Sequence, residues 1–218
     1  MIRAAMFALG TLVTLAPPLR AQGSHLGLLA GPTAATNRGD YVAGTSGLEL
    51  GFSLLAVLDR EFSRVWGVQV GVGWVQKGGR KLRFSGQTSS HGFQTQYVDF
   101  PVSVFAKIHL ANGRLALRPH AGIAVGLAMA CQYKPGDQFE FEEDCGATTP
   151  GGELEAVEVS APLGAALTVE FPGGSKFTIL DVGLQLGLTN VLSGAAAVGQ
   201  SAANTVWSFR FGLLAPLY

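Results

Sequence analysis

Charged and polar residues recur at every second position of several strand-length segments, and they are the first candidates for chemistry. They are Glu49, Gln69, Asp99, Lys107, His109, Arg118, His120, Glu158, Glu170, Asp181 and Arg210. Because successive side chains of a strand point to opposite faces, each of them falls on the same face of its segment. Buried charges must be paired or solvated, so the set predicts a structural network of ion pairs, with a proton path or small pore as the alternative. We expect Arg118 to pair with Glu170, because each lies beside a short turn.

The opposite face of the same segments carries large apolar residues. In residues 66–74 (WGVQVGVGW) every second residue is large and apolar, and the residues between are Gly or Gln. The same apolar face includes Leu48, Leu50, Phe52, Leu54, Val98, Phe100, Val102, Val104, Ala106, Ile108, Leu117, Ile123, Val125, Leu127, Val159, Leu163, Leu167, Val169, Leu180, Val182, Leu184, Leu186 and Leu188. In a narrow barrel, small and charged side chains fit the interior and bulky ones fit lipid. The pattern therefore predicts strands that cross a membrane.

Eight segments have the length and alternation of such strands. They lie near residues 24–34, 46–58, 65–76, 96–110, 114–132, 156–171, 176–192 and 204–216. Short turns at 59–64, 111–113 and 172–175 alternate with long loops at 35–45, 77–95, 133–155 and 193–203. Short periplasmic turns and long outer loops are typical of bacterial outer-membrane barrels. The predicted fold is all-β, an eight-stranded antiparallel up-and-down transmembrane barrel over residues 22–218.

Composition and the first residues agree with export. Only 14% of residues are charged, there are 30 glycines, and basic and acidic residues balance, which gives no indication of nucleic-acid binding. Residues 1–21 are predicted to be a cleaved signal peptide, with Arg3 before an apolar run at 4–16 and Pro17-Pro18 after it. That run is shorter than the roughly 20 residues a membrane helix needs. The expected location is the bacterial outer membrane, in contact with lipid and lipopolysaccharide.

The two cysteines suggest a structural bond at the outer end. Cys131 ends a predicted strand and Cys145 lies in the following loop, and an exported chain is expected to oxidise them to a disulfide. The intervening loop contains an acidic stretch with Asp137, Glu140, Glu142, Glu143 and Asp144. A solvated acidic loop is the expected reading; a cation or a partner on these carboxylates is the alternative. The preceding loop is expected to be basic, with Lys77, Arg80, Lys81 and Arg83, and could pair with it or contact lipopolysaccharide phosphates.

Other reactive residue types favour no catalysis and no cofactor or resident metal. Ser90 and His91 are adjacent, and adjacent strand residues point to opposite faces, which does not suit a nucleophile and its base. His109 and His120 are expected to face inward without a serine. Three tryptophans, Trp66, Trp74 and Trp207, fall on the apolar face and are interpreted as aromatic girdles at the membrane interfaces.

The chain resembles the OmpX-like and PorT-like small outer-membrane barrels over about residues 24–218. The resemblance rests on residues 25–31 (HLGLLAG), 97–102 (YVDFPV), 119–122 (PHAG) and 209–213 (FRFGL). It implies the fold more than an activity. Such barrels often end on an aromatic residue in phase with the outward face, whereas Tyr218 is one residue out of phase, and a bulge at Pro216 is expected to restore it.

Two functions remain open. The first is a non-enzymatic, monomeric barrel with a structural or surface-binding role, adhesion included, through its extracellular loops. The second is transport, as a narrow pore or as the barrel component of a secretion system. A soluble ligand-binding barrel of lipocalin type would need the reverse placement of apolar and polar residues. An eight-stranded interior just wide enough to be filled by side chains favours the first function.

Overall fold

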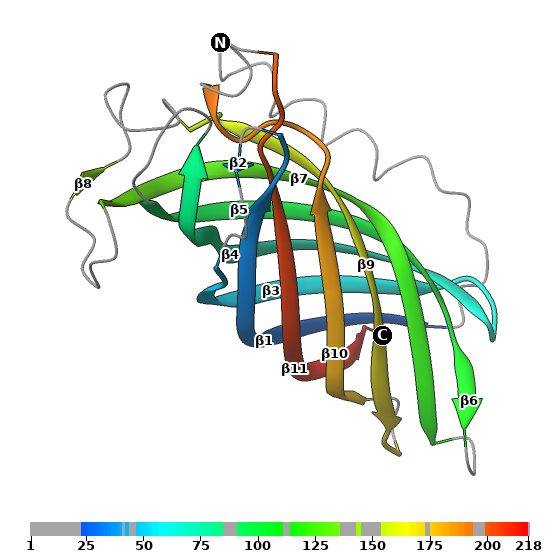
Figure 1. Ribbon diagram of the computed structural model, residues 1–218. Coiled ribbons are helices and arrows are strands. Elements are labelled where there is room, and N and C mark those ends of the chain that lie inside the picture. The colour runs from blue at the N-terminus through cyan, green and yellow to red at the C-terminus, as the bar shows by residue number, and fades with distance from the viewer. Residues whose placement is uncertain are drawn as a thin grey trace, which may run out of the picture.

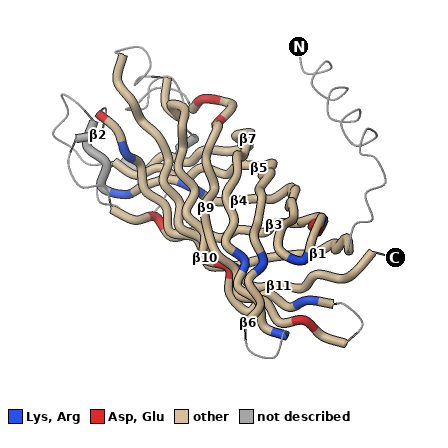
Figure 2. The backbone as a smooth tube through the Cα atoms, turned by 90° about the vertical axis from the view of Figure 1, so that its right-hand side faces the viewer, with Lys and Arg blue, Asp and Glu red and all other residues tan. Residues whose placement is uncertain are grey.

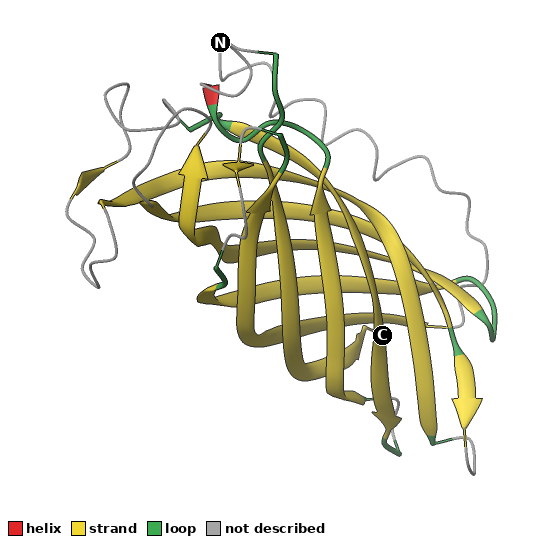
Figure 3. Cartoon of the chain, in the orientation of Figure 1, coloured by secondary structure: helices red, strands yellow, loops and turns green. Residues whose placement is uncertain are grey.

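The computed structural model describes residues 23–40, 42–43, 47–84, 91–110, 114–135, 143–144, 154–172, 175–193 and 199–217. The predicted signal peptide, residues 1–21, lies outside them, and its cleavage stays a prediction. Eight long strands make up the molecule (Figure 3). They are β1 (Gly23–Arg38), β3 (Glu49–Glu61), β4 (Trp66–Phe84), β5 (His91–Ala106), β7 (Leu115–Pro135), β9 (Val157–Glu170), β10 (Lys176–Gly187) and β11 (Ala203–Leu217).

The long strands pair in sequence order, and the last strand pairs with the first. β1 is antiparallel to both β3 and β11, and every other long strand pairs antiparallel with its two neighbours, which closes the sheet into a barrel (Figure 1). The predicted eight-stranded antiparallel barrel is therefore confirmed. Three short strands add to its ends: β2 (Val42–Ala43) pairs with β4, while β6 (Ile108–Leu110) and β8 (Glu143–Asp144) pair with β7.

The two ends of the barrel differ. Ser24 pairs with Leu217, so both ends of the described chain lie at one end of the barrel, which we call the termini end. The opposite end, where β1 finishes at Arg38 and β11 begins at Ala203, carries the longer connections and is called the loop end. β4, β5 and β7 have 19, 16 and 21 residues, against 12 for β10. About 9–11 residues span a bilayer at the usual tilt, so these three strands extend beyond it.

Alternation of side chains produces an apolar exterior. In β3, Leu50, Phe52 and Leu54 are exposed, whereas the intervening Ser53 and Leu55 are buried inside the barrel. Large exposed apolar side chains recur on the outside of all eight long strands, from Leu26 in β1 to Leu217 in β11. Such a belt matches the lipid-facing surface expected of a membrane barrel. Among the described residues, no helix is long and apolar enough to cross a membrane.

The interior departs from the predicted pattern in one sector. Leu29, Leu55, Val57 and Leu214 form a buried apolar cluster on the inner faces of β1, β3 and β11. The inner face is thus mixed and not uniformly small or charged. Removing these side chains from water contributes to stability as it does in a soluble core.

Several predicted boundaries were wrong. β4 continues to Phe84 and β5 starts at His91, so most of the segment expected as a loop at 77–95 is a paired hairpin. β10 ends at Gly187, short of the predicted 192. β11 keeps one register with β1 through Pro216, so the bulge expected there is absent from the described residues. Tyr218 itself lies outside them.

An apolar cap closes the interior at the loop end. Val191, Leu192 and Ala202, from the segments between β10 and β11, are buried against the inward side chains of Phe93 and Tyr133. The cap is held by backbone hydrogen bonds, because Val191 donates to Ala202 and accepts from Glu155. Leu192 also forms an antiparallel bridge with Leu154. The described residues on the two sides of the connection after β10, 188–193 and 199–202, therefore pack inward at the loop end.

Candidate functional site: the charged barrel interior

Strand alternation brings the polar residues of eight different strands into one narrow space. Figure 2 shows basic and acidic residues along the barrel wall, separated by long uncharged stretches. Besides Glu49, which pairs with Arg80 near the loop end, the inward charges fall into four groups between the loop end and the termini end. Each group joins strands that are distant in sequence, so the register of the barrel decides which charges meet.

The group nearest the cap is built around Lys77 of β4. Its ammonium lies 3.0 Å from a carboxylate oxygen of Asp99 and 2.9 Å from one of Glu158, and the lysine side chain has 0% exposure. The same ammonium lies 4.6 Å from the centre of the Tyr97 ring. Gln185 donates a hydrogen bond of 2.8 Å to Asp99. One buried cation thus holds two carboxylates, from β5 and β9, across the interior.

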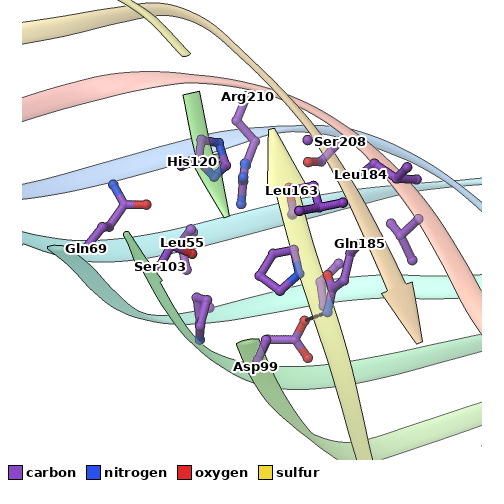
Figure 4. A pocket seen from close by; sticks show the side chains of 18 of the residues that line it. Leu55, Gln69, Asp99, Ser103, His120, Leu163, Leu184, Gln185, Ser208 and Arg210 are labelled. Carbon is purple, nitrogen blue, oxygen red and sulfur yellow. Dashed lines mark hydrogen bonds between the residues drawn. The ribbon is translucent and has the colours of Figure 1, made fainter. Parts of the chain in front are cut away.

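The second group occupies the middle of the barrel and borders a small cavity. Asp181 lies 3.0 Å from His120 Nε2 and 2.8 Å from the Arg210 guanidinium. The cavity beside them has a volume of about 60 Å³, and Figure 4 shows His120, Arg210, Gln69, Asp99 and other side chains around it. Its size suits a few water molecules, and polar groups line it from several sides.

The third group pairs Arg118 of β7 with Asp59 of β3. The guanidinium lies 2.5 Å from the carboxylate, and Gln69 donates to the other oxygen of Asp59 at 2.8 Å. Arg118 also lies 4.0 Å from the centre of the Phe105 ring. The expected pair between Arg118 and Glu170 was wrong: Arg118 is in register with Ala166, which places Glu170 further along β9 towards the termini end.

The fourth group lies at the termini end. Lys107 pairs with Glu170, and Lys176 pairs with Glu61. The pairs also cross, since Lys107 lies 3.6 Å from Glu61 and Lys176 lies 3.6 Å from Glu170. Two lysines and two glutamates therefore form one compact neutral cluster.

One predicted interior residue is placed differently. His109 is exposed in β6, because the strand breaks at Lys107 and continues only as a short rim piece at the barrel edge. The other predicted residues are buried or half-buried on the inner face. Glu49, near the loop end, pairs with Arg80.

Five paired residues were missed by the sequence interpretation, among them Arg80, which was assigned to the basic loop and pairs instead with Glu49. Lys77 was assigned to a loop, although it keeps the inward parity of Gln69 along β4. Asp59 and Glu61 were assigned to a turn, although β3 continues through both. Lys176 was missed because the register shifts between Thr178 and Asp181, which reverses the parity of β10. The two adjacent exposed residues Ile179 and Leu180 were the available signal of that bulge.

The remaining predicted sites lie at the ends of the barrel. Cys131 is disulfide-bonded and packs against the cap, but Cys145 lies outside the described residues, so their pairing stays a prediction. Asp137, Glu140 and Glu142 also lie outside, whereas Glu143 and Asp144 form β8. The cation or partner role of these acids stays a prediction.

The tryptophans lie on the outer face, and His91 lies inside the barrel. Trp66 and Trp207 are exposed on the outer face and Trp74 is half-buried there, so the girdle interpretation stays a prediction. Ser90 lies outside the described residues, and His91 bonds the Tyr133 hydroxyl at 2.7 Å. The arrangement can fix charges and exclude solvent.

Comparison with known proteins identifies a family. The family of the outer membrane protein beta-barrel domain matches residues 20–193. One similar structure is that of Ail, the attachment invasion locus protein of Yersinia pestis, in complex with the heparin analogue sucrose octasulfate. Ail is 16% identical to this chain; the alignment covers 88% of this chain and 99% of Ail, with a TM-score of 0.44. Neisserial surface protein A is 11% identical, with 88% and 98% covered and a TM-score of 0.45. No curated protein matches the chain.

Proposed function

The chain belongs to the outer membrane protein β-barrel family, and on that premise we propose that it is a non-enzymatic barrel with a structural or surface-binding role at its loop end. The barrel lies in the outer membrane, with the apolar belt against lipid. The observation that carries the proposal is the filled interior. Between the cap and the termini end, four groups of paired charges cross the barrel, and Lys77, Arg118 and Lys176 are each buried.

A filled interior opposes conduction for a physical reason. An eight-stranded barrel encloses a space just wide enough for side chains. Opposite charges in short, charge-assisted hydrogen bonds hold one another in place more strongly than neutral pairs do. An ion that enters would have to displace Lys77 from two carboxylates and then Arg118 from Asp59. We therefore propose that the barrel does not conduct ions.

The length of three neighbouring strands supports the surface role. β4, β5 and β7 continue beyond the length needed to span the bilayer, so the hydrogen-bonded sheet projects past the membrane at the loop end. Loops held by a rigid scaffold are frequent binding elements. An extracellular partner, adhesion to a surface, or contact with lipopolysaccharide is the proposed use of this end, by a monomeric protein.

Transport is the second candidate, and the central cavity is the observation that favours it. A cavity of about 60 Å³ lies in the middle of the barrel, lined by apolar side chains as well as by polar ones such as Asp99, His120 and Arg210. Widening of this space along the axis would give a narrow pore or the barrel of a secretion system. Its closure on both sides by buried ion pairs makes transport the weaker proposal.

Conductance separates the two proposals. Purified protein is inserted into planar bilayers, insertion is verified by the heat-dependent gel shift of the recovered protein, and current is recorded under an applied voltage. We expect no stable single-channel openings from the wild type. The Arg118→Ala variant serves as the comparison, because it removes one of the crossings. Reproducible wild-type openings whose ion selectivity changes in Arg118→Ala would reject the non-conducting role and establish the pore.

A further inference from the structure

The outward residues of three neighbouring strands change abruptly from apolar to glutamine near the loop end. On β4, the outward series Val70, Val72 and Trp74 is followed by Gln76, and on β5 the position beyond Val98 is Gln96. Gln94 follows on β5, and Gln132 is the corresponding outward residue of β7. We call Gln76, Gln94, Gln96 and Gln132 the amide patch.

Strand register places the four amides side by side. Gln76 is directly opposite Gln96, and Gln94 is directly opposite Gln132. Side chains directly opposite one another on one face of an antiparallel pair are close neighbours, with Cβ atoms about 5 Å apart. Gln132 is exposed and the other three are half-buried. The four amides therefore lie side by side, and the register also places Asp144 of β8 directly opposite Gln132.

Trp74 borders this patch on the side of the apolar belt. Its indole N–H donates to the side-chain oxygen of Gln96 at 3.3 Å, and the side-chain oxygen of Gln76 accepts from the backbone N–H of Phe52 at 3.0 Å. Within the described part of the chain, the amides of Gln94 and Gln132 make no hydrogen bond to protein. Two of the four glutamines are thus held in place, and two present both a donor and an acceptor outward.

The patch lies where the outer leaflet ends. β4 rises about 26 Å between Trp66 and Trp74 at roughly 3.3 Å per residue, and about 19 Å across the membrane at a tilt of about 45°. An apolar band of about 25 Å with aromatic residues at both borders is usual for these barrels. Gln76 comes two positions after Trp74, at about 23 Å, and Gln94, which is opposite Gly78, comes at about 28 Å, so the patch lies at the outer border of the hydrocarbon.

The chemistry of the patch selects among the groups present in that layer. Phosphates are bound in proteins chiefly by arginine and lysine, and the amide patch has neither. Amides donate to and accept from hydroxyl groups equally, and the edge and face of an indole suit a ligand with apolar and polar sides. Sugar rings have both properties, and the core saccharide of lipopolysaccharide is the sugar layer directly outside the phosphorylated glucosamine headgroup of lipid A.

We infer that Gln76, Gln94, Gln96 and Gln132, with Trp74, form a contact surface for the core saccharide of lipopolysaccharide. This deepens the proposed surface role and rests on it. Arg80, four positions beyond Gln76 on β4, is paired with Glu49 and is not needed for the contact. The sugar would lie against β4, β5 and β7, and the membrane would hold it at the depth of the amides.

The test follows binding by the fluorescence emission of Trp74. The full chain, with Trp66→Phe and Trp207→Phe to leave one tryptophan, is kept in detergent and titrated with lipopolysaccharide bearing a complete core, and separately with lipid A. We expect the complete core to bind about tenfold more tightly, as for one or two well-formed hydrogen bonds. Core oligosaccharide freed of lipid should compete, and inorganic phosphate should not.

Two further variants decide the outcome. In the double variant Gln94→Ala with Gln132→Ala, the ratio of the affinities for complete-core lipopolysaccharide and for lipid A should fall close to one. Thr205 is an outward polar residue of β11 at the same end, and Thr205→Ala should leave this ratio unchanged. A heat-dependent gel shift shows that each variant is folded. The inference is overturned by equal binding of lipid A and complete-core lipopolysaccharide, by competition from phosphate alone, or by a full preference in the double alanine variant. Channel activity would reject the proposed function without bearing on this ratio.

Discussion

Replacement of Lys77 by methionine should be the most costly single charge removal in the barrel. The lysine side chain has 0% exposure, and its two partners, Asp99 and Glu158, have 9% and 1%. Methionine keeps most of the volume and removes the charge, which leaves two buried carboxylates without their cation. Loss of one partner of a buried pair costs about 3–5 kcal/mol. We expect about 4 kcal/mol, which is close to a thousandfold in the folding equilibrium.

The matched control is Arg80→Met, because Arg80 is 42% exposed and pairs with Glu49 near the loop end. Its guanidinium is partly solvated although Glu49 is only 5% exposed, so its loss should cost less than the loss of the fully buried Lys77. Lys77→Met with Glu158→Gln should recover part of the loss, because it also removes one stranded charge. Urea unfolding of protein in lipid vesicles, followed by tryptophan emission and gel shift, gives the free energy of unfolding. Equal losses for Lys77→Met and Arg80→Met would refute the view that the Lys77 group is a buried, mutually dependent network.

Two further predictions concern the lipid face and the disulfide. Val70→Arg and Leu184→Arg should each destabilise the folded barrel by about 2–4 kcal/mol, whereas Thr205→Arg, near the edge of the belt, should cost about 0–1 kcal/mol; similar unfolding midpoints for all three in vesicles would contradict the assignment of faces. Cys131 and Cys145 should be oxidised in protein taken from the outer membrane, and Cys131→Ser should lower stability by about 3 kcal/mol. Free thiols at both positions, detected by alkylation and mass spectrometry, would disprove the bond.

Strand number and membrane-facing parity could be predicted because both depend on local alternation. Trp74 and Val70 share a face whatever the rest of the chain does, and the structure shows both on the outside. The ends of the strands were harder to predict, because a polar residue such as Lys77 is as common in a loop as on the inner face of a polar barrel. Composition alone could not distinguish the two.

The pairing of charges could not be predicted, because it depends on register and bulges. Arg118 meets Asp59 across strands that are not neighbours in the sheet, which requires the stagger of the closed barrel. A single extra residue at Ile179–Leu180 moves Lys176 from the predicted outer face to the interior. His109 shows the opposite effect. Its parity predicted an inward side chain, but the barrel wall ends before this residue, and His109 is exposed in β6.

The closing seam between β1 and β11 has a consequence for how the chain folds. Its register runs from Ser24 with Leu217 to Arg38 with Ala203, so the first and last strands to emerge during synthesis must find each other. Contacts between residues so distant in sequence are slow to form, because the whole intervening chain must be ordered first. Until β11 arrives, β1 presents an unpaired edge that can pair with other chains. The barrel is therefore complete only when its last residues are in place, and a chain truncated before β11 would keep two open edges and no closed structure.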